Sequence, residues 1–308
     1  MDAISLKSVC KSFGQVQAVR DLNARIPTGS IYGFLGPNGA GKTTTIRMIM
    51  NIIRPDSGTI EVLGNNWPQQ IKDRVGYMPE ERGLYRKMTA AKVLAYFASI
   101  KGVPSHKLSE TVSTWLRSVE LSEWANKRVE ELSRGMHQKL QFAVTAVNDP
   151  DLLILDEPFA GLDPLNTDLL KAIICQMKEQ GKTIIFSTHI MHEAERLCDY
   201  ILLINKGKVI LDGSLTEIRS RFKSDLLSVE TEGDRTLPQN IPGAKVIKSE
   251  GNNFDIALTE HTDTQQLLRY LMQHVRIRSF EVKTPSLHEI FVELVGKKDA
   301  QNTPNRPA

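Results

Sequence analysis

The chain has 308 residues, of which 41% are hydrophobic and 24% are charged, and its formal net charge at pH 7 is +3. This composition is typical of a globular protein with one large domain or two unequal ones, and the near balance of charge argues against nucleic acid as the main partner. No apolar run reaches the roughly 18–20 residues of a membrane-spanning helix, so we expect no span within these residues.

The first ten residues lack the apolar segment of a secretory signal, so we expect no such signal here. Cys10, Cys175 and Cys198 are scattered, without the short or even-numbered spacing of metal sites and disulfide frameworks. This usage is typical of a reducing compartment, in which the three cysteines serve as packing residues.

Three apolar runs that end in polar residues predict buried strands over residues 30–36, 152–158 and 183–189. Helical patterns lie between such runs, which favours an α/β domain with a mostly parallel sheet over residues 1–220. Residues 86–140 carry helical patterns and are interpreted as a helical insertion. Because open α/β sheets bind ligands at the carboxyl ends of their strands, the polar ends are candidate site positions.

Beyond residue 220 the pattern changes to short strands separated by turns that contain proline or glycine. Strands are predicted at residues 226–231, 244–250, 253–259 and 277–284, with helices at 264–275 and 286–295. Residues 221–296 are therefore predicted to form a small α+β unit with an antiparallel sheet, for which a ferredoxin-like arrangement is one candidate. Residues 297–308 are polar and contain proline, and we expect them to be disordered.

The sequence GPNGAGKTT at residues 36–44 fits the pattern G-x-x-x-x-G-K-[ST] of a phosphate-binding loop. It follows a predicted strand and precedes a helical pattern, which is the context that this motif requires. The glycines let backbone N–H groups approach a phosphate, Lys42 can reach phosphate oxygens, and the Thr43 hydroxyl can ligate Mg²⁺. The candidate phosphate-binding residues are Gly36, Pro37, Asn38, Gly39, Ala40, Gly41, Lys42, Thr43 and Thr44.

Acidic and histidine side chains end the other two predicted strands. Asp156 could hold Mg²⁺ directly or through water, Glu157 could polarise an attacking water, and His189 could reach a terminal phosphate. The alternatives are an acidic strand end that caps a helix and a structural histidine. A metal site formed by His189 and His192 would lack an apparent third ligand, and its spacing matches no zincin motif.

The segment SRGM at residues 133–136 opens a predicted helix whose apolar residues recur at i, i+3, i+4 and i+7. Ser133 precedes the first turn and is a candidate N-terminal cap. Two interpretations are open at this point. The segment is either an ordinary cap on a core helix or a helix N-terminus that meets a phosphate as half of an active site.

In chain order, the segments GPNGAGKTT, LSRGM, LLILDEP, AGLD and STH resemble the motifs of the ATP-binding subunits of ABC transporters, over about residues 3–220. The resemblance implies a P-loop NTPase core with a helical subdomain, ATP and Mg²⁺ as cofactors, and a head-to-tail homodimer or heterodimer. Each ATP would lie between the phosphate loop of one subunit and the signature segment of the other.

The resemblance also implies roles for individual residues. Phe13 would stack on the adenine ring, and the alternative is a core aromatic. Glu157 would be the catalytic base, His189 would sense the γ-phosphate, and Thr43 and Asp156 would hold Mg²⁺. The signature that meets the partner's ATP would consist of Ser133, Arg134, Gly135 and Met136, the loop linking the two sites would contain Asp163, and the loop that contacts the membrane subunit would contain Glu80.

Two features depart from the family pattern. Glu80 stands where the family usually has glutamine, and Arg134 and Met136 depart from the usual LSGGQ signature. We expect a variant but working signature, in which Arg134 either supplies positive charge or points to solvent. Together with the C-terminal unit, these departures resemble the subgroup typified by bacterial sodium-exporter ATPase subunits.

The leading hypothesis is an ATP-hydrolysing subunit of an ABC exporter, held at the cytoplasmic face of the cell membrane by separately encoded integral membrane permease subunits. One alternative is a soluble ABC-type ATPase that acts on a macromolecular complex such as the ribosome. Another is a regulatory protein that holds ATP without turning it over. The C-terminal unit carries no chemical motif, and its candidate roles are dimer contact, regulation or simple stabilisation.

Overall fold

The computed structural model describes residues 1–65, 69–81, 83–222, 226–233, 237–238, 240–259, 262–283 and 285–301. The chain divides into two compact units, Met1–Leu215 and Thr216–Ala308. Within the described ranges, no helix combines the length and the apolar composition that crossing a bilayer requires.

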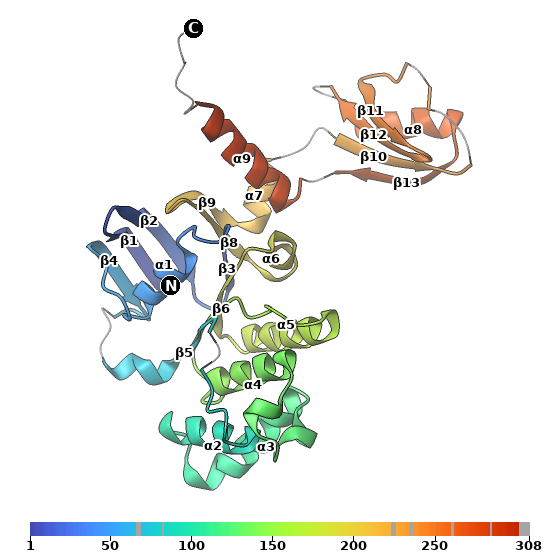
Figure 1. Ribbon diagram of the computed structural model, residues 1–308. Helices are drawn as coiled ribbons and strands as arrows, with labels where there is room; N and C mark the ends of the chain where they lie inside the picture. The colour runs from blue at the N-terminus through green and yellow to red at the C-terminus, as the bar shows by residue number, and fades with distance from the viewer. Residues whose placement is uncertain are drawn as a thin grey trace. The chain divides into compact units, whose positions relative to one another are not determined.

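A six-stranded sheet forms the centre of the first unit, in the order β5-β6-β7-β3-β8-β9 (Figure 1). Its strands are β3 (Ile31–Leu35), β5 (Val75–Met78), β6 (Leu152–Asp156), β7 (Thr183–Thr188), β8 (Tyr200–Asn205) and β9 (Lys208–Ser214). All neighbours are parallel except β8 and β9, and every residue of β3, β6 and β7 is buried. Burial on both faces explains why these three strands are continuous apolar runs in the sequence.

A second sheet of three antiparallel strands has the order β2-β1-β4 and was not predicted. Its strands are β1 (Asp2–Phe13), β2 (Val16–Pro27) and β4 (Ser57–Val62). Buried residues of β1 and β2, such as Ile4 and Leu22, share one apolar core with Phe34 of β3 and Ile154 of β6. Helix α1 (Lys42–Ile49) contacts β2, β4 and β6, so both sheets hold the start of this helix in place.

Helices α2 (Ala90–Ile100), α3 (Leu108–Ser118) and α4 (Arg134–Ala146) gather at one end of the first unit (Figure 1). They correspond to the predicted helical insertion at about residues 86–140, and α4 extends past the end of that range to Ala146. Helices α5 (Pro164–Glu179) and α6 (Met191–Leu197) follow strands β6 and β7. Helix α7 (Leu215–Arg221) begins at the last residue of the first unit, and its other residues belong to the second unit.

The second unit contains an antiparallel sheet in the order β11-β12-β10-β13. Its elements are β10 (Leu226–Thr231), β11 (Ala244–Glu250), β12 (Asn253–Leu258), α8 (Thr264–His274), β13 (Ile277–Val282) and α9 (Leu287–Gln301). The strand order is that of a ferredoxin-like sheet, but the described residues between β10 and β11 form no helix. Helix α9 includes residues 297–301 of the tail that we expected to be disordered, and residues 302–308 lie outside the described ranges.

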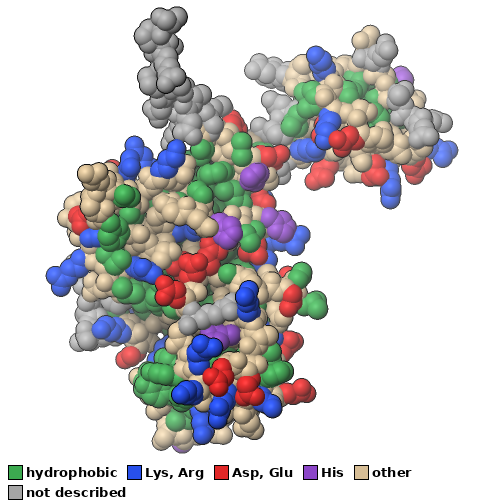
Figure 2. Space-filling model, viewed as in Figure 1, with side chains coloured by type: hydrophobic (Ala, Val, Ile, Leu, Met, Phe, Trp, Pro, Cys, Tyr) green, Lys and Arg blue, Asp and Glu red, His purple; other side chains and the backbone are tan. Residues whose placement is uncertain are grey.

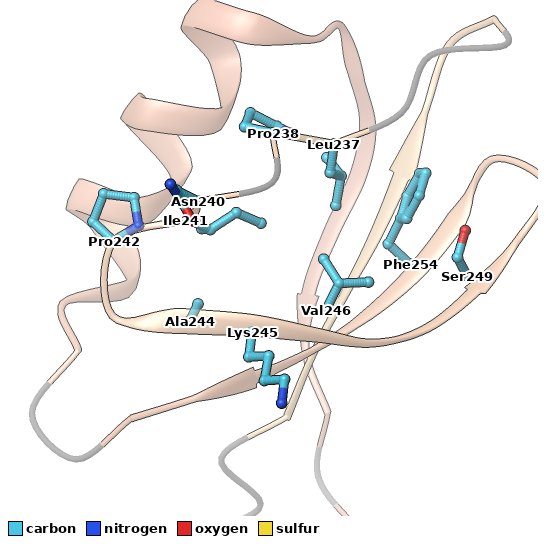
Figure 3. A pocket seen from close by; sticks show the side chains of 10 residues that line it. All are labelled: Leu237, Pro238, Asn240, Ile241, Pro242, Ala244, Lys245, Val246, Ser249 and Phe254. Atoms are coloured by element: carbon cyan, nitrogen blue, oxygen red, sulfur yellow. The ribbon is translucent and has the colours of Figure 1, made fainter.

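The second unit also has a cavity of about 770 Å³ beside β11. The side chains of Leu237, Val246 and Phe254 turn toward one another, whereas Lys245 points away on the other side of its strand (Figure 3). Leu237, Ile241 and Phe254 belong to the apolar core of this unit. The cavity is therefore a gap at the edge of a hydrophobic core rather than a site that gathers charged groups.

Candidate functional site

The loop at residues 36–41 joins β3 to α1 and wraps around the side chain of Lys42, the first residue of that helix. The Lys42 ammonium donates to the carbonyl oxygens of Gly36, at 2.7 Å, and Pro37, at 3.3 Å. Gly36 has a φ of 153°, and a Cβ there would lie 2.1 Å from the carbonyl oxygen of Ile204. Gly41 is the N-cap of α1, and no capping side chain accepts a hydrogen bond from the first turn of this helix. The N–H groups of that turn are therefore available to an anion.

This loop lines a pocket of about 310 Å³ that also takes in acidic side chains. Burial lowers the pKa of Lys42, and the nearby carboxylates of Glu157, Asp156 and Glu80 oppose that shift. One side of the first unit shows acidic, basic and histidine side chains close together (Figure 2). The pocket is lined by Ala18, Asn38, Gly39, Ala40, Gly41, Lys42, Thr43, Thr44, Glu80 and Glu157.

Asp156 is the last residue of β6, and its side chain is buried beside the pocket, with 1% of the residue exposed. Its Oδ1 atom accepts hydrogen bonds from Thr43 Oγ1, at 3.3 Å, and from Ser187 Oγ. Its Oδ2 atom is buried and has no hydrogen-bond partner among the described residues. A buried carboxylate oxygen without a partner beside a hydroxyl is a suitable donor set for Mg²⁺, which prefers one or two protein oxygens together with water and phosphate.

Glu157 brings two other predicted residues together. Its Oε1 atom lies 3.8 Å from Lys42 Nζ and 3.1 Å from His189 Nδ1. The backbone of Glu157 has a φ of 50°, and its N–H donates to the carbonyl oxygen and the hydroxyl of Ser187. A left-handed glutamate costs about 1–3 kcal/mol, so the neighbouring strand β7 must hold this conformation. The structure therefore places Lys42 and His189 beside the carboxylate of Glu157.

Among the described residues, no group of three or more His, Cys, Asp or Glu side chains is arranged to hold a metal ion. His189 and His192, for which the sequence offered no third ligand, therefore belong to no such group among these residues. His189 instead contacts Glu157, and half of its side chain is exposed.

Two buried glutamines of α4 were not singled out in the sequence. Gln138 Nε2 donates to the carbonyl oxygens of Pro158, at 2.9 Å, and Glu157, at 3.3 Å. Gln141 Nε2 donates to the carbonyl oxygens of Pro79, at 2.8 Å, and Glu81, at 3.2 Å. The only indication in the sequence is two amide side chains three residues apart on a helix that is otherwise rich in apolar residues.

The signature segment lies at the N-terminus of α4 and does not line the pocket of its own chain. Ser133 accepts a hydrogen bond from Met136 N at 3.3 Å, so it is an N-cap as predicted from the pattern. A Cβ at Gly135 would lie 3.4 Å from Leu162, which precedes Asp163. Asp163 in turn caps α5 through the backbone N–H of Asn166, at 2.9 Å.

Phe13 lies at the end of β1 and is 50% exposed, which excludes the alternative of a core aromatic. It is not among the residues that line the pocket, although Ala18 of the following strand is. The ammonium of Lys11 lies over the Phe13 ring, 5.6 Å from its centroid, and pairs with Asp56 at 2.6 Å.

Comparisons with known proteins identify the family. Residues 19–160 match the family model described as ABC transporter, and residues 213–295 match the model described as ATP-binding protein DrrA1-3-like, C-terminal domain. The chain is 38% identical over 293 residues to the uncharacterized ABC transporter ATP-binding protein YhaQ of Bacillus subtilis, covering 95% of this chain and 98% of YhaQ. The chain belongs to the family of ABC transporter ATP-binding proteins.

Two further members of this ABC transporter family support the assignment. The Nod factor export ATP-binding protein I of Sinorhizobium fredii is 34% identical, with 96% of this chain and 87% of the relative covered. The solved structure of an ATP-binding subunit of an ABC transporter superposes with a TM-score of 0.67 at 30% identity, covering 71% of this chain and 93% of that subunit. The predicted P-loop NTPase fold is therefore confirmed.

Membership in this ABC transporter family also fixes the general activity. ABC ATP-binding subunits bind ATP, hydrolyse it to drive transport, dimerise, and work with membrane permease partners. The expectation of an ATP-hydrolysing transporter subunit is confirmed at this level.

Proposed function

We propose that this chain is the ATPase subunit of an exporter and that it cleaves ATP in the pocket between β3, α1 and β6. The observation that carries this proposal is the convergence of Lys42, Asp156 and Glu157 at one place, with Lys42 Nζ 3.8 Å from Glu157 Oε1. An ammonium for phosphate oxygens and a carboxylate for an attacking water are the two groups that phosphoryl transfer to water requires.

The proposed roles within one subunit follow from these positions. The N–H groups of residues 36–44 and Lys42 hold the phosphates, and Phe13, exposed at the end of β1, stacks on adenine as the family resemblance implies. Glu157 accepts the proton of the attacking water, and His189, which contacts Glu157, senses the γ-phosphate. Thr43 and Asp156 would hold a Mg²⁺ ion, which would neutralise charge that develops on the phosphates. Glu80 lines the same pocket and adds a third carboxylate near Lys42.

The proposed second half of the site comes from another subunit. Ser133, Arg134, Gly135 and Met136 do not line the pocket of their own chain. Their helix presents its N-terminus, which favours a negative charge, and Arg134 is exposed. We infer that they meet the γ-phosphate held by a partner subunit in a head-to-tail homodimer or heterodimer, with Asp163 on the loop between the two sites.

We assign the membrane contact to the first unit and an accessory role to the second. Residues 1–220 would form the ATP-binding domain, and residues 221–296 a separate domain for dimer contact or regulation. The permease would place this protein at the cytoplasmic face of the membrane. The similarity to a Nod factor export ATP-binding protein over 96% of this chain supports export as the direction of transport.

The test uses the purified full-length chain and its Glu157→Gln variant. We expect the wild type to release phosphate from ATP and the variant to lose at least about 100-fold in kcat, because glutamine cannot accept the proton. The variant should keep ATP affinity and accumulate as an ATP-bound dimer in light scattering after gel filtration. Equal phosphate release from the two proteins would refute the role of Glu157. Absence of ATP hydrolysis in the wild type would refute the proposed function.

A further inference from the structure

Gln141 of α4 holds both carbonyl groups that flank Glu80. Its side chain is 4% exposed, and its amide nitrogen donates to Pro79 O at 2.8 Å and to Glu81 O at 3.2 Å. A glutamine NH₂ group has two protons, so both of its donors serve this one loop. The bonded carbonyls belong to the residues before and after Glu80, so these hydrogen bonds restrain the path of the backbone at this residue.

The orientation of the Gln141 amide follows from its neighbours. If its oxygen and nitrogen were exchanged, two carbonyl oxygens would face a third oxygen, so only the assigned orientation makes hydrogen bonds. The remaining atom, Oε1, is buried and has no partner among the described residues. An unsatisfied buried acceptor is unfavourable, and a leucine at this position would avoid it. Packing alone therefore does not account for an amide at residue 141.

The position of Glu80 matters for the nucleotide pocket. Glu80 lines this pocket together with Lys42 and Glu157, and its carboxylate acts on the Lys42 ammonium. Downstream, the same loop continues to Tyr85, whose ring contacts Tyr96 and Phe97 of α2. Residues 79–81 thus lie between the phosphate site and the helical end of the first unit, and Gln141 bonds this segment to α4.

Helix α4 also contacts the segment that carries Glu157, a second residue that lines the pocket. Gln138, one turn before Gln141, donates to the carbonyls of Glu157 and Pro158. The N-terminus of the same helix is the signature segment at residues 133–136. Because the signature segment, Gln138 and Gln141 belong to one helix, a displacement of that helix would act on both loops.

We propose that Gln141 is a positioning residue that sets where the Glu80 carboxylate lies relative to the phosphates, so that α4 couples the signature segment to the pocket of its own chain. The inference rests on the proposed function, because Glu80 acts only if ATP is cleaved in this pocket. Gln141 itself does not touch the nucleotide.

The test is a double-mutant cycle on ATP hydrolysis by the full-length chain, with Gln141→Leu, Glu80→Ala and the combined variant. Leucine has a volume close to that of glutamine but no donor. We expect Gln141→Leu to lower kcat about 10-fold at saturating ATP with KM for ATP changed less than about twofold, since misplacement of a site group by an ångström costs up to about 100-fold. In the Glu80→Ala background, Gln141→Leu should cause no further fall, because its effect passes through Glu80.

Thr145→Val is the matched control. Thr145 is buried on the same helix, and among the described residues its hydroxyl bonds only to the carbonyl of Gln141, so its loss touches neither loop. We expect this variant to keep the wild-type kcat. Equal falls in kcat from Gln141→Leu in the two backgrounds, no fall in either, or a similar fall in Thr145→Val would overturn the inference. A wild type without ATPase activity would instead refute the proposed function, and with it this inference.

Discussion

The Nζ atom of Lys42 lies 3.8 Å from Oε1 of Glu157, and both side chains are buried in the proposed nucleotide pocket. Lys42 also lies within electrostatic reach of Asp156 and Glu80, so one ammonium faces three carboxylates. Burial lowers the pKa of Lys42 and the carboxylates raise it, with burial the larger effect. This arrangement needs further positive charge when phosphates enter, which is the chemistry that a bound Mg²⁺ would supply.

Replacement of this ammonium should therefore weaken nucleotide binding more than it weakens the fold. Removing one partner of a buried charged contact costs about 2–5 kcal/mol, so we expect Lys42→Met to lower ATP affinity by about 100-fold. Titration with a fluorescent ATP analogue measures this change. Lys139→Met is the control, because Lys139 is equally buried but pairs with Glu120 at 3.7 Å, outside the pocket. A similar loss of affinity in both variants would contradict a direct contact between Lys42 and phosphate.

Two glycines of the phosphate loop should respond differently to alanine. Gly39 has a φ of 76°, and a Cβ added there would have no atom within 4 Å, whereas Gly41 has a φ of 112° and a Cβ there would lie 2.5 Å from Ala18 O. Gly39→Ala should cost about 1–2 kcal/mol of unfolding free energy through its backbone alone. Gly41→Ala should cost more and also displace the N-terminus of α1, with loss of ATP binding. Urea unfolding and ATP titration of the two variants test this, and equal effects would exclude the predicted overlap.

Lys101 gives a stability prediction that depends on pH. Its ammonium donates to the carbonyls of Val144 and Thr145 in the last turn of α4, and burial lowers its pKa from 10.5 to about 8. The folded chain therefore binds fewer protons than the unfolded chain between these two values, so this residue makes the protein more stable as pH rises from about 8 to 10.5. Below about pH 8 the desolvation penalty is fully present.

Lys101→Met should remove this dependence. The unfolding free energy of the wild type minus that of the variant should increase by about 3 kcal/mol across the window, as an order-of-magnitude value. Urea unfolding of both proteins at about pH 8 and about pH 10.5, the two ends of the window, measures the change. Lys92→Met is the control, because Lys92 is exposed on α2, the helix that Lys101 caps at its C-terminus. A difference that stays constant with pH would contradict the predicted effect of burial.

The central strands and the phosphate loop could be predicted because their causes are local. Strands β3, β6 and β7 are buried on both faces and read as apolar runs, and parallel strands place their carboxyl ends at one edge. This rule alone brings the predicted positions of Lys42, Glu157 and His189 together, as the structure shows.

The sheet formed by β1, β2 and β4 was missed for a different reason. Its pairing contains register shifts, and Ser8 and Asp21 have positive φ values, so neither long strand shows clean alternation in the sequence. Gln141 was missed because its partners are backbone carbonyls about 60 residues earlier in the chain. Every residue has a backbone carbonyl, so no side-chain pattern indicates where such a hydrogen bond will form.

Ser133 has two roles that a pair of substitutions can separate. Its hydroxyl caps α4 within its own chain, and in the proposed dimer it faces the phosphate of the partner. Ser133→Asp keeps the cap, since aspartate is as good an N-cap as serine, whereas Ser133→Ala loses about 1 kcal/mol of unfolding free energy. The new carboxylate would, however, meet the γ-phosphate and repel it. We therefore expect Ser133→Ala to lose more stability than Ser133→Asp, and Ser133→Asp to lose more dimer closure than Ser133→Ala.

In a Glu157→Gln background, Ser133→Asp should abolish ATP-driven dimerisation, and Ser133→Ala should weaken it less. Both should bind ATP as monomers with the affinity of the parent, because residues 133–136 do not line the pocket of their own chain. Gel filtration with light scattering measures dimerisation, and urea unfolding measures the cap. If Ser133→Asp dimerises as readily as its parent, the signature segment does not face a nucleotide. In that case Ser133 would be only the N-cap that the single chain shows.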